Sequence, residues 1–232
     1  MFVNKKTICF EKTGLFSQLI IDFINHEDNL NPFLTSFSNL ESIESSLPVI
    51  SQDVRKEFVN VLNEQYEKTV FLNDASLSIK AHINSLLSTK TYTVTTGHQL
   101  SIFASPLFLI YKIISTISYA QFLNKKLPDY NFVPCFWMAT EDHDFKEINS
   151  CKFYNQEYFW ELNHQDAIGN LSSNSILPTL DKMKKVLTQT IFGRELYNIY
   201  SFVYTNNENY ADATRSLLTT FFKKHGLIIV DG

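Results

Sequence analysis

Apolar residues recur at helical spacing in the first third of the chain and form strand-like runs after residue 90. Between residues 53 and 70 they follow a period close to 3.6 residues, which predicts an amphipathic helix. Residues 1–88 are therefore expected to form an N-terminal helical segment. From residue 91 to 95 the chain is dense in β-branched and aromatic side chains, and this composition predicts a first strand.

A βαβ unit is predicted between residues 91 and 144. Residues 96–99 look like a polar turn, and Ser105 followed by Pro106 is typical of a helix start. The helix is expected to run to about Leu123 and to be buried on more than one face, because Lys112 is its only charged residue before that point. The continuous apolar run 132–139 indicates a second strand, of the kind found in parallel sheets covered on both faces.

The rest of the chain extends this α/β pattern. Further strands are expected within residues 151–162, and helices over 179–187, 194–204 and 210–225. Residues 227–230 are all aliphatic and predict a third buried strand. We therefore expect residues 89–232 to form a Rossmann-like core with a parallel sheet and an inserted connective segment at about 151–208. A core of three strands is small, so sequence is expected to be missing after Gly232.

Composition and charge narrow the class of protein. Hydrophobic residues make up 44% and charged residues 19%, which is typical of a globular fold. The net charge of −4 gives no basic excess for nucleic acid, so no nucleic-acid partner is expected. Polar residues interrupt the apolar stretch 100–123, which favours a buried helix over a membrane span. Three distant cysteines and no signal peptide indicate a cytoplasmic protein without disulfides or a zinc knuckle.

The candidate chemistry lies at the ends of the first two strands. Ligands of open α/β sheets bind beyond the carboxyl ends of the strands, so the polar segments 96–99 and 140–144 should face one crevice if the strands are neighbours. Together with the start of the following helix, the first segment could hold a nucleotide phosphate. A plain capped turn is the alternative, and Lys112 either reaches a phosphate or extends into solvent. The assigned cofactor-binding residues are Thr96, Gly97, His98 and Gln99.

The second segment concentrates three carboxylates and one imidazole. Asp142 and Asp144 suit a substrate ammonium group or a divalent cation, and His143 between them suits proton transfer. These three residues are assigned as catalytic, Glu141 and Trp137 as substrate-binding, and no metal-ligand set is assigned. The alternative is a solvated acidic loop, but its abrupt emergence from an apolar strand argues against it.

Four stretches carry a resemblance to a known family. They are TTGHQ (95–99), SPLFLIYKIIS (105–115), VPCFWMATEDHDFKEIN (133–149) and GLIIVDG (226–232). Together they resemble the bacillithiol-synthesis cysteine-adding enzymes, in which a TGQQ segment, an apolar helix and an EDHDF segment follow one another. The helical preamble fits the same pattern, so the resemblance covers most of the chain.

The resemblance implies both a fold and an activity. It implies a Rossmann-like core related to nucleotidyltransferases and class I aminoacyl-tRNA synthetases, in which segment 96–99 takes the place of the HIGH-like nucleotide signature. It implies a ligase that joins L-cysteine to glucosaminyl-malate, with ATP as cofactor and Mg²⁺ as a further candidate. It also implies a C-terminal coiled coil that dimerises the enzyme, so a homodimer is expected only where that coiled coil is present.

Three departures from the family pattern matter. His98 stands where many members have glutamine, and Ala104-Ser105 replaces threonine-glycine before the proline. The family is also roughly twice as long. The alternatives to a cysteine ligase are therefore a related small-molecule nucleotidyltransferase and a truncated, non-catalytic nucleotide-binding fragment.

Overall fold

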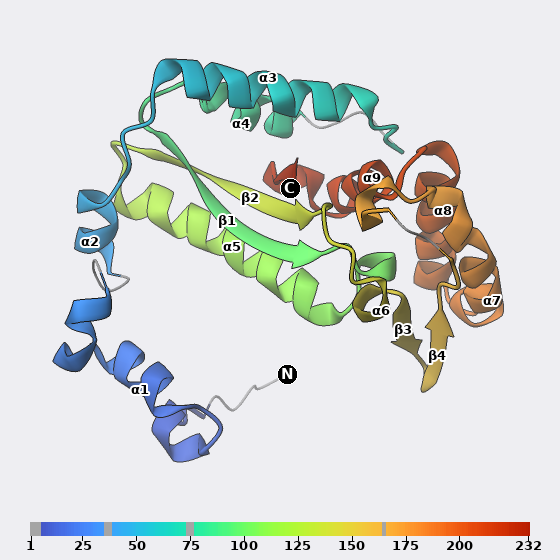
Figure 1. Ribbon diagram of the computed structural model, residues 1–232, viewed down its shortest axis with the longest axis horizontal. Coiled ribbons are helices and arrows are strands. Elements are labelled where there is room, and N and C mark those ends of the chain that lie inside the picture. Colours follow the sequence, from blue (N-terminus) through green and yellow to red (C-terminus); the bar gives the residue numbers. More distant parts are fainter. Residues whose placement is uncertain (1–5, 35–38, 73–76, 164–165) are drawn as a thin grey trace. The chain divides into compact units, whose positions relative to one another are not determined.

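The computed structural model describes residues 6–34, 39–72, 77–163 and 166–232 (Figure 1). Its contacts divide the chain into two compact units, Met1–Val49 and Ile50–Gly232. Within the described residues, no helix is long and apolar enough to cross a membrane.

The first unit is helical, and it contains α1 (Gln18–Asn25) and α2 (Leu40–Ser45). Most of the apolar side chains of α1 remain exposed; Leu19, for example, is 65% exposed. Leu30 is the only buried side chain among the described residues of this unit.

The second unit is built on a three-stranded parallel sheet in the order β1-β2-β5. The strands are β1 (Thr91–Gln99), β2 (Asn131–Ala139) and β5 (Ile228–Asp231). All nine residues of β1 pair with β2, from Thr91 opposite Asn131 to Gln99 opposite Ala139. The predicted α/β class, the parallel arrangement and all three predicted core strands are confirmed.

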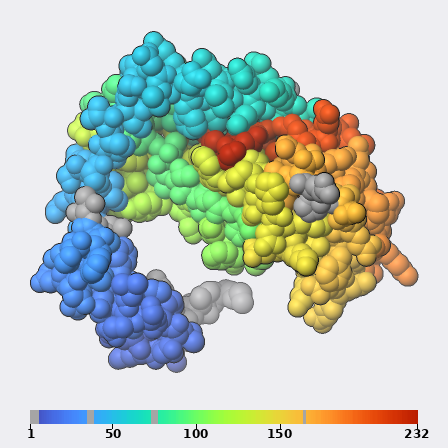
Figure 2. Space-filling view, in the orientation of Figure 1, coloured from blue at the N-terminus to red at the C-terminus, as the bar shows by residue number. Residues whose placement is uncertain are grey.

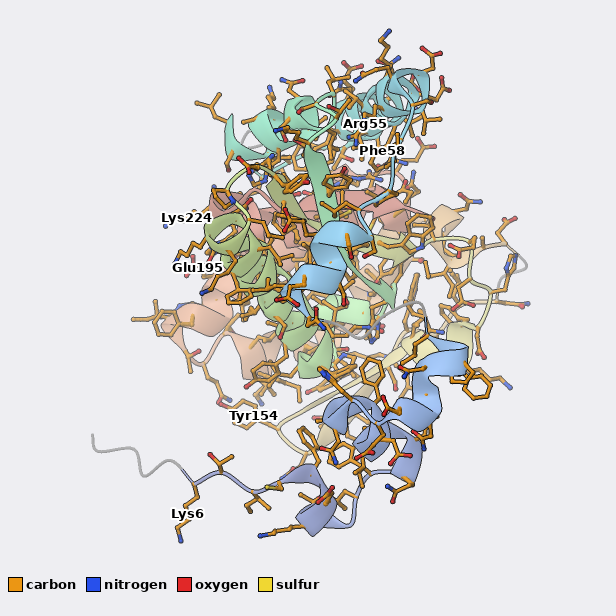
Figure 3. The ribbon with its side chains drawn as sticks, turned by 90° about the vertical axis from the view of Figure 1, so that its left-hand side faces the viewer. Lys6, Arg55, Phe58, Tyr154, Glu195 and Lys224 are labelled. Atoms are coloured by element: carbon orange, nitrogen blue, oxygen red, sulfur yellow. The ribbon has the colours of Figure 1, made fainter. Side chains whose placement is uncertain are left out.

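Helices cover both faces of this sheet (Figure 1). On one face, α3 (Gln52–Lys68) and α4 (Leu77–Ser85) pack against Val133 and Cys135 of β2. The buried Arg55 of α3, labelled in Figure 3, donates hydrogen bonds to the carbonyl oxygens of Leu86 and Thr91, both at 2.9 Å. On the other face, α5 (Leu107–Lys126) packs against Phe136, because successive side chains of a strand point to opposite faces.

The segment between β2 and β5 forms a hairpin and a layer of helices. Its elements are α6 (Phe145–Ile148), β3 (Ser150–Phe153), β4 (Gln156–Phe159), α7 (Leu177–Leu187), α8 (Ile191–Asn206) and α9 (Tyr210–Phe222). Trp160 is fully buried between Phe145 and Tyr210, with ring centroids at 4.9 and 4.6 Å. This contact ties the end of the hairpin to the start of α9.

Helix α3 also closes the outer edge of β5. The backbone N–H of Ile229 donates to the Tyr66 hydroxyl at 3.0 Å, and that of Asp231 donates to Gln65 Oε1 at 3.4 Å. These bonds satisfy backbone groups that would otherwise face outward from the short edge strand. The carboxyl end of β5 is therefore held in place by side chains from a distant part of the sequence.

Three details of the predicted βαβ unit are wrong. Residues 96–99 are not a turn but the last four residues of β1, because they pair with 136–139 of the apolar strand beside them. The following helix begins at Leu107 with Pro106 as its N-cap, one residue later than the predicted Ser105 cap, since Pro106 has an extended ψ of 170°. Helix α5 is buried on one face only, because a single sheet lies against it, and several apolar side chains are exposed: Leu107, Phe108, Tyr111, Ile114, Tyr119 and Phe122.

Candidate functional site at the carboxyl edge of the sheet

The two polar segments meet at the carboxyl ends of β1 and β2. The amide nitrogen of Gln99, the last residue of β1, donates to Asp142 Oδ2 and to Glu147 Oε2, both at 2.7 Å. Asp142 lies in the loop after β2, and Glu147 lies on α6. We call these three residues the carboxyl-edge cluster; they bring together one predicted cofactor residue, one predicted catalytic residue and one acid that the sequence analysis did not select.

Backbone contacts hold the loop after β2 in one conformation. The N–H of Ile168 donates to the carbonyl of Asp142 at 2.8 Å, and the N–H of Gly169 donates to that of Thr140 at 2.9 Å. Gly169 is buried so closely that a Cβ atom there would lie 2.7 Å from Thr140 Cβ. The backbone of the loop is therefore held by the neighbouring segment, although Glu141, His143 and Asp144 are exposed to solvent.

Asp142 is the most strongly fixed carboxylate of the loop. Its Oδ1 accepts the backbone N–H of Asp144 at 3.0 Å while its Oδ2 accepts the Gln99 amide. These hydrogen bonds, first from the Asp144 N–H and then from Gln99, hold the pKa of Asp142 below its usual value. Asp142 is therefore ionised at neutral pH, which suits it to bind a cation and makes it a weak proton acceptor.

His143 and Asp144 are both exposed at the tip of this loop. An exposed imidazole can reach a ligand above the cluster and exchange protons with solvent, as a proton carrier must. This exposure is compatible with the proton transfer that the sequence predicts for His143, and that role stays a prediction.

His98 and Lys112 lie toward the α5 side of the sheet. Lys112 donates from Nζ to the carbonyl oxygen of Gly97 at 2.5 Å and lies 5.5 Å from the Phe108 ring centroid. Of the two alternatives for Lys112, a phosphate contact or extension into solvent, neither describes the structure, in which the ammonium group lies against β1. His98 Nδ1 lies 3.0 Å from the carbonyl oxygen of Gln99. Because a carbonyl oxygen only accepts hydrogen bonds, Nδ1 carries the proton in this contact. In the neutral ring Nε2 is then an acceptor, so it can donate to a phosphate only in the imidazolium form.

Trp137 and Glu141 lie toward the α3 side instead. Trp137 is opposite Gly97 in the sheet and is 45% exposed. A side chain at Gly232 would collide with Glu141 Oε2 and Trp137 Nε1, so both residues lie against the end of β5. The predicted cofactor residue His98 and the predicted substrate residues are therefore on opposite faces of one sheet edge.

Two more charged residues at this edge were not among the predicted site residues. Asp231 ends β5, and the fully buried Arg215 of α9 donates to its Oδ1. The carboxyl-end rule, applied to the third strand as it was to the first two, would have found Asp231. Arg215 gives no such signal, because a helical arginine is normally exposed.

In the part of the chain that the structure describes, no group of three or more His, Cys, Asp or Glu side chains is arranged to bind a metal ion.

Comparison with known proteins decides the family. The family model described as "Bacillithiol biosynthesis BshC, N-terminal Rossmann-like domain" matches residues 3–232. The chain belongs to the BshC family. The predicted family resemblance and the predicted Rossmann-like fold are thereby confirmed.

Several BshC proteins are similar to this chain over nearly its whole length. The protein from Flavobacterium johnsoniae is 36% identical over 228 residues, covering 97% of this chain and 42% of the relative. That from Flavobacterium psychrophilum is 37% identical over 230 residues, covering 97% and 43%, respectively. The Cytophaga hutchinsonii protein is 31% identical over 229 residues, covering 96% and 41%. All three carry the name "Putative cysteine ligase BshC", and the chain spans less than half of their length.

Proposed function

We propose that the protein to which this chain belongs is a ligase that joins the carboxyl group of L-cysteine to the amine of glucosaminyl-malate, forming an amide in bacillithiol biosynthesis. Membership of the BshC family and the names of its relatives support the reaction class. The observation that carries the proposal is the carboxyl-edge cluster, in which Gln99 holds an ionised Asp142 at the ligand-binding edge of the sheet. An ionised carboxylate there suits the ammonium group of an amino acid.

ATP is the proposed source of activation, and the residues on the α5 side fit its phosphates. Among the described residues no side chain caps the first turn of α5, in which the N–H of Leu109 donates to the Pro106 carbonyl at 2.9 Å. The N–H groups that precede Leu109 in the helix and the positive end of the helix dipole suit an anion. The Lys112 ammonium and the His98 imidazole lie on the same side of β1. When bound, ATP would turn the cysteine carboxylate into an acyl group with a good leaving group.

Gly97 and Gln99 have different parts in this proposal. Gly97 lies between Trp137 and Lys112, so its lack of a side chain keeps the strand end accessible, and Thr96 precedes it on the α5 side. The two amide hydrogens of Gln99 already serve Asp142 and Glu147, so Gln99 reaches a phosphate only if one of these bonds breaks. We therefore propose that Gln99 chiefly positions the two carboxylates.

The remaining residues are proposed to handle the reacting groups. Asp142 holds the cysteine ammonium, and Asp144 adds negative charge beside it. When the acceptor amine forms the new C–N bond, the acyl bond to the leaving group breaks and His143 accepts the proton that the amine loses. Trp137 and Glu141 contact the acceptor on the α3 side. Holding the reactants in line supplies much of the rate.

The test is product formation by the full-length protein from cysteine, glucosaminyl-malate and ATP, followed by mass spectrometry. We expect a product heavier than the acceptor by one cysteinyl residue. Asp142→Asn should lower kcat/KM by about tenfold to a hundredfold, because it removes a charge-assisted hydrogen bond. Asp129→Asn, an exposed residue in the turn after α5, is the matched control and should have no effect. Absence of product with the wild-type protein, or equal activity of the two variants, would refute the proposal.

A further inference from the structure

A polar cavity lies at the end of β5, next to the loop after β2 and on the α3 side of the sheet. It has a volume of about 550 Å³, is open to solvent, and is lined by α3, the start of α9, the loop after β2 and the end of β5. Figure 2 shows the C-terminal residues, in the darkest red, reaching the surface between α3 and the segment after β2. The volume falls within the range of roughly 300–1,000 Å³ that is usual for small-molecule sites.

The charge of this cavity, which we call the α3-side cavity, is negative. Its charged lining residues are Glu64, Lys68, Glu141, Asp212 and Asp231. Arg215 lies behind the wall, so four carboxylates stand against two cations and two negative charges remain uncompensated. The cavity therefore favours a ligand that carries positive charge.

Arg215 shows that two of these carboxylates are held in place from the protein interior. Its guanidinium is fully buried and donates to Asp212 Oδ1 at 2.5 Å, to Thr69 Oγ1 at 2.6 Å and to Asp231 Oδ1. A buried charge needs such partners, and in return it fixes their orientation. The Asp231 side chain remains 26% exposed, and among the described residues no hydrogen bond reaches its Oδ2. That oxygen is available to a ligand.

The neutral lining of the cavity suits hydroxyl groups. Gln65 accepts the N–H of Asp231 through Oε1, and its amide nitrogen can still donate. The side chain of Asn170 adds a second amide, and Thr140 adds a hydroxyl. Carboxylates, amides and a hydroxyl group together suit the amine and hydroxyl groups of an amino sugar.

We propose that the α3-side cavity binds the amine-bearing, hydroxyl-rich acceptor of the ligation, with the ammonium group and ring hydroxyls of an amino sugar held by Asp231, Glu64 and Glu141. The proposal rests on the proposed function, because only the ligation calls for an acceptor amine. The nucleotide would then approach from the α5 side and the acceptor from the α3 side. The two would meet above Asp142, at the edge they share.

Binding of simple amino sugars to the full-length protein tests this directly, without ATP or cysteine. Glucosamine is the probe, and N-acetylglucosamine is the matched control, since it keeps the ring but lacks the charge. By calorimetry or ligand-observed NMR, we expect glucosamine to bind at least about tenfold more tightly, the usual scale of one charge-assisted hydrogen bond. Equal affinity for the two sugars, or no binding of glucosamine, would overturn the proposal.

Variants locate the site. Asp231→Asn and Glu64→Gln should each weaken glucosamine binding by about tenfold. Glu64→Gln guards against a folding defect, because Glu64 is an exposed residue of α3 and contributes no buried contact. Glu195→Gln, on the surface of α8 and outside the cavity, should leave binding unchanged (Figure 3). If Glu64→Gln and Asp231→Asn are each properly folded and each bind glucosamine as tightly as the wild type, the sugar binds elsewhere.

Product formation separates this inference from the proposed function. In the active enzyme, Glu64→Gln should raise KM for glucosaminyl-malate and leave KM for cysteine unchanged. If product forms but neither cavity variant alters the acceptor KM, the cavity assignment is wrong and the ligase function stands. If no product forms although glucosamine binding depends on Asp231, the ligase function is wrong, and the cavity is an amino-sugar site but not the acceptor site of a ligation.

Discussion

Replacing Arg215 by Met should unfold the second unit at a much lower denaturant concentration. The change keeps most of the side-chain volume but removes a guanidinium that is 0% exposed, next to carboxylates that are 13% and 26% exposed. Breaking a buried ion pair costs roughly 3–5 kcal/mol when the remaining charge is fully buried. Since both acids reach some solvent, the lower end, about 3 kcal/mol, is expected. With a urea m value of about 2 kcal/mol/M, the midpoint should fall by about 1.5 M.

Tryptophan fluorescence is the appropriate measurement, because both tryptophans, Trp137 and Trp160, lie in the second unit. The matched control is Arg194→Met, which removes an exposed arginine that donates to a single carbonyl at 3.0 Å. It should change the free energy of unfolding by less than about 0.5 kcal/mol. Adding Asp231→Asn to Arg215→Met should restore part of the loss, since it removes an unpaired charge. A midpoint for Arg215→Met that matches the control would refute the view that Arg215 holds the wall of the cavity.

Three further predictions follow from contacts at the same edge and in the core. Gln99→Leu should raise the pKa of Asp142 by removing one of its two strongest donors, which carboxyl ¹³C NMR would detect as a titration shifted to higher pH; an unchanged titration would contradict the contact. The stabilisation from Asp142 is present above its unfolded pKa and is lost as the pH falls through its lowered folded pKa, so Gln99→Leu should flatten the acid limb of urea stability. Iodoacetamide at pH 8 should modify only the exposed Cys9 of the native protein, because burial raises the pKa of Cys135 to about 12 and Cys151 is also buried. Rapid modification of all three cysteines, measured by mass spectrometry, would contradict this. Gly169→Ala should destabilise the fold by about 1–3 kcal/mol in urea, since its Cβ would overlap the loop after β2, and a neutral effect would show that the loop yields.

The elements of the core were predictable because each carries its own local pattern. The β-branched start of β1, the aliphatic run of β5 and the apolar run of β2 all predict strands without reference to neighbours. The end of β1 was not predictable in this way. Its last four residues are polar, and they form a strand because β2 continues beside them as far as Ala139. Strand length here depends on the partner, and periodicity along one segment does not contain that information.

The candidate site, like the core, was predictable only in part. The rule that ligands bind at the carboxyl ends of parallel strands correctly places Gln99 near Asp142. It does not find Arg215, which lies within a helix and reaches Thr69, a residue 146 positions away. Nor does it separate the two faces of the edge, because that requires knowing which helix covers which side.

The most direct test of the account is a double-mutant cycle on kcat/KM for cysteine addition, combining Gln99→Leu with Asp142→Asn in the full-length enzyme. If Gln99 acts by holding Asp142, the two changes remove one interaction. The kcat/KM of the double variant should then be at most about threefold lower than that of the less active single variant. If the two losses multiply, the residues act independently, and the carboxyl ends of β1 and β2 do not form one catalytic site.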